Sequence, residues 1–214
     1  MQIPKFVGTV KRVVFHRIPL HPDELVAYWL LWRFGESMFP GIREAEIVIR
    51  TDAGGLFEGK EWYIHWAEGT LLLGTGGGPL DEHAFGDEER KEDECCATLT
   101  ADLLGVSGDP TLQRILEETR DNDVWGKNLD KVMHFPEEVR CDFKYPRMSP
   151  HAVIWMRLCI LDSLYDGQVN FWAAADDLSK ATITPVKTPR QEYVIITALT
   201  VNEEFAKYAR SKHA

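Results

Sequence analysis

The fold class is decided by residues 6–34, which read FVGTVKRVVFHRIPLHPDELVAYWLLWRF. Residues 6–15 are rich in valine and phenylalanine, which favours a β-strand that ends at His16. Residues 23–34 are apolar almost all round, which predicts a buried helix. Pro22 stands directly before this helix, at a position where proline is common. The segment therefore predicts a strand, a polar loop and a buried helix in succession.

The same alternation continues along the first two thirds of the chain. Further strands are predicted at residues 46–51, 62–66 and 70–73, and helices at residues 96–104 and 111–120. Strands that alternate with helices are typical of a mostly parallel sheet with helices on both faces. We therefore predict an α/β fold in which ligands bind beyond the carboxyl ends of the strands.

The last third of the chain has a different pattern. Residues 135–150 contain three prolines and are predicted to form a connector. After it we predict helices at residues 152–165 and 171–178, a strand at 193–199 and a helix at 202–212. These elements divide the chain into a main domain, residues 1–134, and a small α+β extension, residues 135–214, that packs on or covers the site.

The composition excludes several classes of protein. A chain of 214 residues with 44% hydrophobic and 27% charged residues is expected to bury one sizeable core. No apolar run approaches the ~18 residues of a membrane helix, and the N-terminus lacks a signal-peptide pattern. Four cysteines without CxxC spacing favour a reduced, cytoplasmic protein. A net charge of −10 argues against binding duplex DNA, but it allows a small anionic substrate held by a metal ion.

Two polar segments follow predicted strands and combine imidazole with carboxylate groups. The first contains His16, His21, Asp23 and Glu24, and the second contains Gly76, Gly77, Gly78, Asp81, Glu82 and His83. This combination of ligand types suits Mn²⁺, Fe²⁺, Zn²⁺ or Co²⁺ better than Ca²⁺. The alternative is that Asp23 and Glu24 only stabilise the start of a helix, while the other side chains are solvated.

The order of these motifs resembles that of the DHH phosphoesterase superfamily, and most closely its Myg-type (melanocyte-proliferating-gene) metal-dependent hydrolases. The resemblance covers about residues 8–125. In chain order, the matching positions are His16, His21, Asp23 and Glu24, then Arg50, Thr51 and Asp52, then Gly76, Gly77, Gly78, Asp81, Glu82 and His83, then residues 95–99, and last Asp121, Asn122 and Asp123. The chain departs from the family at Glu82, where the family has histidine. It also has Gly74-Thr75 where the family has an acidic residue, for which Asp52, or else Glu68, is expected to compensate.

The resemblance implies a DHH-like fold and a phosphoester hydrolase that binds one or two divalent ions, preferably Mn²⁺. The implied metal ligands are His16, His21, Asp23, Asp52, Glu82 and Asp121. The implied catalytic residues are His83, as general acid or phosphate-orienting group, and Asp81, which supports a ligand or the loop. Arg17, Lys127, Lys187 and Arg190 are candidates for binding the substrate, although a solvated surface position explains each of them more simply.

The expected substrate is a nucleotide, a short single-stranded oligonucleotide or an RNA end, and no membrane partner is expected. A homo-oligomer is compatible with the sequence. The main alternative is a catalytically degraded DHH-like protein that serves as a binding or scaffold module, which Glu82 and the missing acidic residue favour. Trp66, Trp125 and Trp172 are suited to stacking on a base, but they are more simply explained as core or partner-surface residues.

Overall fold

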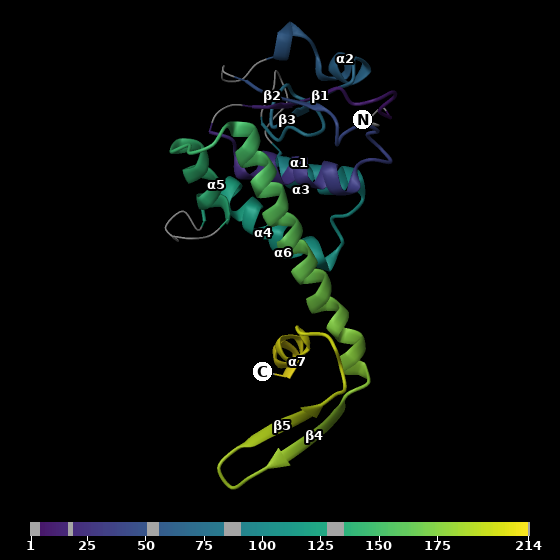
Figure 1. Cartoon of the computed structure of the whole chain (residues 1–214), viewed down its shortest axis with the longest axis vertical. Coiled ribbons are helices and arrows are strands. Elements are labelled where there is room, and N and C mark those ends of the chain that lie inside the picture. Colours follow the sequence, from purple (N-terminus) through teal and green to yellow (C-terminus); the bar gives the residue numbers. More distant parts are fainter. Residues whose placement is uncertain (1–4, 17–18, 51–55, 84–90, 128–134, 214) are drawn as a thin grey trace. The chain divides into compact units, whose positions relative to one another are not determined.

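The computed structural model describes residues 5–16, 19–50, 56–83, 91–127 and 135–213 (Figure 1). The chain divides into two compact units, Met1–Leu161 and Asp162–Ala214. The boundary falls inside a long helix, so residues 135–161 group with the first unit. Within the described ranges, no helix is both long enough and apolar enough to cross a membrane.

The first unit is built on a three-stranded parallel sheet. Its strands are β1 (Arg12–Phe15), β2 (Glu46–Ile49) and β3 (Thr70–Leu73), in the spatial order β2-β1-β3. The last residue of β1, Phe15, is in register with the last residues of β2 and β3. The three carboxyl ends therefore meet at one edge of the sheet, with β1 in the middle.

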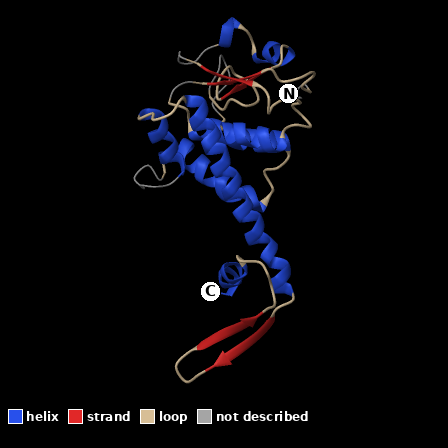
Figure 2. Cartoon of the chain, viewed as in Figure 1, coloured by secondary structure: helices blue, strands red, loops and turns tan. Residues whose placement is uncertain are grey.

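Helices cover both faces of this sheet, so the structure confirms the predicted α/β class. On one face lie α1 (Pro22–Phe34) and α3 (Cys96–Leu104), and on the other lies α2 (Trp62–Ala67) (Figure 2). The chain moves to one neighbour of β1 through α1 and to the other neighbour through α2. A reversal of this kind creates a crevice at the carboxyl ends of the strands.

Helix α1 is the centre of the core, as its composition predicts. Every residue from Pro22 to Leu31 is buried, and the ring of Tyr28 packs edge-on against Phe15 of β1 at a centroid distance of 5.5 Å. Full burial of one such side chain contributes about 1.5–3 kcal/mol. The helix is therefore held rigidly, and so are the polar residues at its start.

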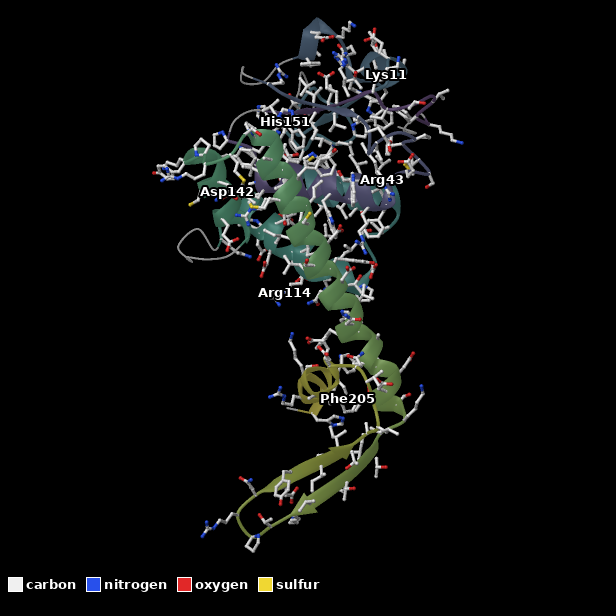
Figure 3. The ribbon with its side chains drawn as sticks, in the orientation of Figure 1. Lys11, Arg43, Arg114, Asp142, His151 and Phe205 are labelled. Atoms are coloured by element: carbon white, nitrogen blue, oxygen red, sulfur yellow. The ribbon has the colours of Figure 1, made fainter. Side chains whose placement is uncertain are left out.

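The first unit is completed by three further helices and a short 3₁₀ turn. These are η1 (Phe57–Gly59), α4 (Pro110–Trp125), α5 (Phe135–Lys144) and the first part of α6 (Pro150–Ser179). At the start of α6, the Nε2 atom of His151 lies 3.2 Å from the carbonyl oxygen of Ile47 in β2 (Figure 3). This contact joins α6 to the sheet.

Three predicted elements differ from the structure. Residues 62–66 form helix α2 instead of a strand, because helical spacing brings the rings of Trp62 and Trp66 to 5.3 Å and lets Trp66 pack against Phe6 and Phe39. Residues 135–144 form a helix instead of a connector, because proline is tolerated in a first helical turn. The two helices expected within residues 152–178 are one continuous helix.

The second unit contains a hairpin and a helix. Strands β4 (Thr182–Lys187) and β5 (Glu192–Thr197) pair antiparallel, and α7 (Phe205–His213) ends the unit. The strand and helix predicted for β5 and α7 are confirmed, with shifted ends. Residues 182–187, for which no element was predicted, form the other strand of the hairpin.

Candidate metal centre

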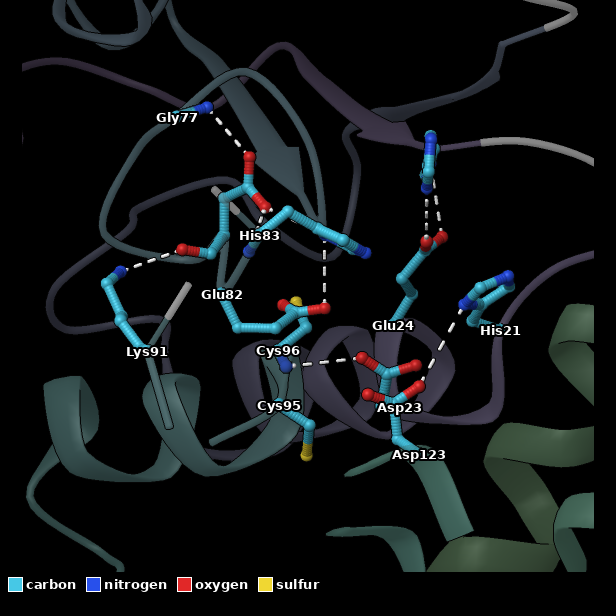
Figure 4. Close-up of polar contacts among 12 residues, drawn as sticks. His21, Asp23, Glu24, Gly77, Glu82, His83, Lys91, Cys95, Cys96 and Asp123 are labelled. Carbon is cyan, nitrogen blue, oxygen red and sulfur yellow. Dashed lines mark hydrogen bonds and ion pairs between the residues drawn. The ribbon is translucent and has the colours of Figure 1, made fainter. Parts of the chain in front are cut away.

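Three histidines and five carboxylates converge at the carboxyl end of the sheet (Figure 4). They follow β1 and β3, begin α1 and come from the end of α4. We call this set the carboxylate–histidine cluster; its members are His16, His21, Asp23, Glu24, Asp81, Glu82, His83 and Asp123. The site therefore lies where the crevice of a parallel sheet is expected.

The start of α1 places two carboxylates inside the protein. The side chains of Asp23 and Glu24 are each only 1% exposed. The backbone N–H of Cys96, the first residue of α3, donates to Asp23 Oδ2 at 3.2 Å. The backbone N–H of His16 donates to Glu24 Oε2 at 3.1 Å. Both carboxylates are thus oriented by backbone donors from neighbouring elements.

Glycine is favoured at position 74 by its backbone conformation and by the closeness of Glu24. Gly74 has φ +58°, and a Cβ atom there would lie 3.0 Å from Glu24 Oε1. The Glu24 carboxylate therefore lies against the position where the resemblance expects an acidic residue. Glu68 lies elsewhere, since Lys60 Nζ donates to both of its carboxylate oxygens, at 2.9 and 2.7 Å. Asp52 is outside the described residues.

The loop after β3 holds Asp81, Glu82 and His83. Asp81 accepts hydrogen bonds from the backbone N–H groups of Gly77 at 2.7 Å and of His83 at 3.0 Å. The His83 Nδ1 atom lies 3.0 Å from Asp81 Oδ1 and 3.2 Å from Glu82 Oε1. Lys91 Nζ donates to the carbonyl oxygen of Asp81 at 2.7 Å. These contacts fix the loop and the orientation of the His83 ring.

The histidine rings connect the two sides of the cluster. The His16 ring centroid lies 6.0 Å from that of His21 and 5.6 Å from that of His83. On the outer side, His21 Nδ1 lies 4.0 Å from Asp123 Oδ1. His16 therefore stands between two groups of ligand-type side chains.

Each of these groups has the spacing of a metal site. In the first, one ligand atom from each of His21, Asp23 and Asp123 lies within 4.8 Å of the others. In the second, the same holds for Asp81, Glu82 and His83. Each combines one imidazole with two carboxylates, the ligand types expected for Mn²⁺, Fe²⁺ or Zn²⁺.

Burial and mutual repulsion disfavour the charged forms of the buried carboxylates. Burial raises the pKa of Asp23 well above its ordinary value, and repulsion by Asp123 and Glu82 adds to this shift. Burial and the neighbouring Asp23 raise the pKa of Glu24 in the same way. For Glu82 the burial effect is again the largest, and its pKa rises to about 7. A bound cation would stabilise the ionised forms of these three carboxylates.

Asp81 differs from these three carboxylates. Burial opposes its ionisation, but the hydrogen bonds from the His83 side chain and from the backbone of Gly77 and His83 outweigh that effect and lower its pKa. Asp81 is therefore ionised, and its hydrogen bonds connect it to the loop backbone and to the His83 ring. This suits a residue that orients both.

Three buried carboxylate oxygens support the fit to a cation. Within the described residues, Asp23 Oδ1, Glu24 Oε1 and Glu82 Oε2 have no hydrogen-bond partner. A buried carboxylate oxygen without a partner is costly, and a coordinated metal ion would satisfy it. The donor set and these oxygens therefore fit a hard or borderline divalent ion.

The structure brings together most of the residues predicted for the site. Among the predicted ligands and catalytic residues, His16, His21, Asp23, Asp81, Glu82 and His83 lie in the cluster. Arg17 and Asp52 lie outside the described residues. Lys187 and Arg190 belong to the hairpin of the second unit, where Lys187 pairs with Glu192.

Asp121 is replaced in the cluster by Asp123. Asp121 faces Lys127 and Arg120, at 3.4 and 3.8 Å, whereas Asp123 points to His21. The helical period of α4 contains the signal that separates them. The buried residues of this helix are Leu112, Ile115, Leu116, Thr119 and Asn122. Asp123 lies four residues after Thr119 and continues that stripe, and Asp121 does not.

The sequence alone did not identify the roles of Glu24 and of the adjacent cysteines. Glu24 was not among the predicted ligands, although it follows Asp23 directly in a helix that is buried all round. Burial raises the pKa of the Cys95 and Cys96 thiols, so neither is an activated nucleophile. Cys96 contributes its backbone N–H instead.

No protein-family model matches this chain, and no curated protein or solved structure shows significant similarity to it.

Proposed function

We propose that the carboxylate–histidine cluster binds one or two divalent cations, preferably Mn²⁺, and that the chain hydrolyses phosphoesters of nucleotides or short single-stranded nucleic acids. The observation that carries the metal site is the group of buried carboxylates with raised pKa values and unsatisfied oxygens beside three imidazoles. The phosphoester substrate rests on the resemblance of the ordered motifs to DHH phosphoesterases.

Within this proposal, the two ligand groups would hold the metal. His21, Asp23 and Asp123 form one group, and Glu82 contributes its carboxylate from the other, in which His83 transfers protons and Asp81 orients the His83 ring. A bound divalent ion lowers the pKa of water and neutralises charge on phosphoryl oxygens. Glu24 and His16 lie at the sides of these groups and complete the set of oxygen and nitrogen donors.

His83 is the residue best placed to move a proton. Its Nδ1 atom lies 3.0 Å from Asp81 Oδ1, and a proton on Nδ1 would be held there, so that Nε2 carries the lone pair. A ring oriented in this way exchanges a proton through Nε2 with a leaving or attacking oxygen. His83 is also the most exposed side chain of its group, at 37%, so substrate reaches it.

The test is turnover of a phosphoester panel by protein purified without chelator. The panel contains bis(p-nitrophenyl) phosphate, nucleoside monophosphates and short single-stranded oligonucleotides, each with and without Mn²⁺. We expect Mn²⁺-dependent hydrolysis, and we expect His83→Asn to lower kcat by about 10²–10⁴-fold, the usual contribution of general acid–base catalysis.

His151→Asn is the matched control, because His151 is an exposed histidine of the same unit outside the cluster. It is expected to leave kcat unchanged. Mn²⁺ binding without turnover of any ester would refute the hydrolase and favour a binding or scaffold module. Turnover that persists in His83→Asn would refute only the role of that residue.

A further inference from the structure

The second unit leaves about half of its large apolar side chains exposed to solvent. The residues that are at least 38% exposed are Leu164, Val169, Ile183, Tyr193, Val194, Ile195, Leu199 and Val201. Within the described part of this unit, the buried hydrophobic residues are Ala174, Tyr208 and Ala209. A two-stranded hairpin with so little cover is at best marginally stable in water. The hairpin would therefore gain stability from further contacts.

An apolar groove lies beside the hairpin. It has a volume of about 810 Å³ and runs between the two strands and α7. Pro185, Val194 and Ile196 line it from the hairpin, and Ala209 lines it from α7. One face of the hairpin is thus directed toward a helix of its own unit, and within the described residues neither strand of the hairpin pairs with a third strand.

The turn fixes which backbone groups point outward from the hairpin. Thr188 N–H donates to the Gln191 carbonyl at 2.9 Å, so this pair is hydrogen-bonded. Bonded and non-bonded pairs alternate in an antiparallel ladder. Counting from the turn, Pro185 and Val194 form a non-bonded pair. Their backbone groups therefore point to the outer edges, as do those of Glu192 and Ile196.

The two outer edges differ in their capacity to add a strand. On β4 one outward position, near the middle of the strand, is Pro185, which has no N–H to donate. On β5 the outward positions carry a complete set of N–H and C=O groups within the sequence EYVIIT, which has neither proline nor glycine. An apolar edge of this kind is a template for another strand.

We propose that β5 pairs antiparallel with β5 of a second copy of this chain, which joins two hairpins into a four-stranded sheet. An antiparallel pair of identical strands is self-complementary under a two-fold axis. With Ile195 on the axis, Val194 bonds to Ile196 of the partner subunit, and the whole of β5 is paired. This surface is independent of the metal site.

The charges at this edge oppose pairing with a second copy only weakly. The chain has a net charge of −10, which opposes self-association in general. Residues 182–197, in contrast, carry Lys187, Arg190 and Glu192, which sum to +1. In the proposed register Glu192 lies opposite Ala198 of the partner subunit, so no like charges meet. Charge repulsion therefore opposes strand pairing only weakly at this edge.

Sedimentation equilibrium of the 214-residue chain over a wide concentration range tests this proposal. We expect a reversible dimer of twice the 24.5 kDa chain mass. Ile195→Lys places two ammonium groups opposite each other at the axis and is expected to raise the dimer dissociation constant about tenfold or more. Thr184→Lys, on the strand opposite Ile195, is the matched control and should leave the constant unchanged.

A cross-linking experiment distinguishes this edge from any other interface. Because the exposed Cys141 and Cys159 would interfere, both are replaced by serine. In that background Ile195→Cys is expected to form an intermolecular disulfide under mild oxidation, and Thr184→Cys is not. Circular dichroism confirms that each variant is folded. A monomeric wild type, or a dimer unaffected by Ile195→Lys and without the Ile195→Cys cross-link, would overturn the proposal.

Discussion

The two units of this chain differ in how much of their side-chain surface they bury. The first unit encloses a large apolar core around α1 and also buries carboxylates such as Asp23 and Glu24 at the edge of the sheet. The second unit buries few apolar side chains and exposes Tyr193, Val194 and Ile195 on its hairpin. The first unit therefore has stability that offsets the cost of buried charge, as ligand sites require, whereas the second depends on additional contacts.

The largest expected effect is on the core of the first unit. Leu30 in α1 is fully buried, so Leu30→Ala should lower the free energy of unfolding by about 2–5 kcal/mol. Leu199→Ala, at a fully exposed position of the second unit, should change it by less than about 0.5 kcal/mol. Urea denaturation followed by circular dichroism measures both. Equal losses would contradict the contrast between the units.

The next effect concerns charge in the metal-free cluster. Burial raises the pKa of Glu82 from its ordinary value of 4.5 to about 7. The stability that the folded protein gains from protonated Glu82 is therefore fully present below pH 4.5 and is lost as the pH rises through 7. The metal-free protein should therefore unfold at a higher temperature at pH 6 than at pH 8. The full cost of ionising Glu82 is on the order of 3 kcal/mol.

Glu82→Gln removes this titration and is its matched control. The variant should show a smaller difference in unfolding temperature between pH 6 and pH 8 than the wild type, in the absence of metal. Added Mn²⁺ should stabilise the wild type more at pH 8, because metal ligands bind in their deprotonated forms. A metal-free wild type that becomes more stable as the pH rises from 6 to 8 would contradict this assignment.

A smaller effect is expected at Gly74. Gly74→Ala forces a side chain into positive φ and within 3.0 Å of Glu24 Oε1, and should lower the free energy of unfolding by about 1–2 kcal/mol. Gly108→Ala is the control, because a Cβ atom at that position would meet nothing within 4 Å. Thermal unfolding and Mn²⁺ affinity are measured for both. If Gly74→Ala left the Mn²⁺ affinity unchanged, the contact between Gly74 and Glu24 would not position Glu24 for metal binding.

The smallest effect is expected on the surface of the second unit. Lys187 pairs with Glu192, and both side chains are largely exposed. Lys187→Ala should change the free energy of unfolding by less than about 0.5 kcal/mol, because exposed ion pairs contribute little. Denaturant unfolding measures this change. A loss of several kcal/mol would show that the hairpin is more tightly organised than its exposure indicates.

Much of the first unit could be predicted from the sequence, because its signals are local. Strand–helix alternation indicated the parallel sheet, and the apolar character of residues 23–34 indicated the buried helix α1. Residues 62–66 were mistaken for a strand because their aromatic composition is typical of strands, while the packing of Trp66 on Phe6 and Phe39 is a long-range effect. Tertiary packing thus overrode local preference.

The site was predictable to the extent that ligand types cluster in sequence. His16, His21 and Asp23 stand close together in the chain, and their placement at the end of β1 follows from the fold. Asp123 required the phase of helix α4, and Glu24 required knowledge of which side of α1 meets the loop at Gly74. The first relation can be read from the apolar period of the helix, whereas the second arises only from the assembled structure.

The central claim is that the carboxylate–histidine cluster binds a divalent metal, and calorimetric titration with Mn²⁺ tests it most directly. The matched pair is Asp123→Asn, inside the cluster, and Asp121→Asn, two residues earlier on the same helix but paired with Lys127 outside it. We predict that Asp123→Asn weakens Mn²⁺ binding by at least about tenfold, whereas Asp121→Asn binds like the wild type. Equal affinities in all three proteins, or no binding by the wild type, would contradict the account.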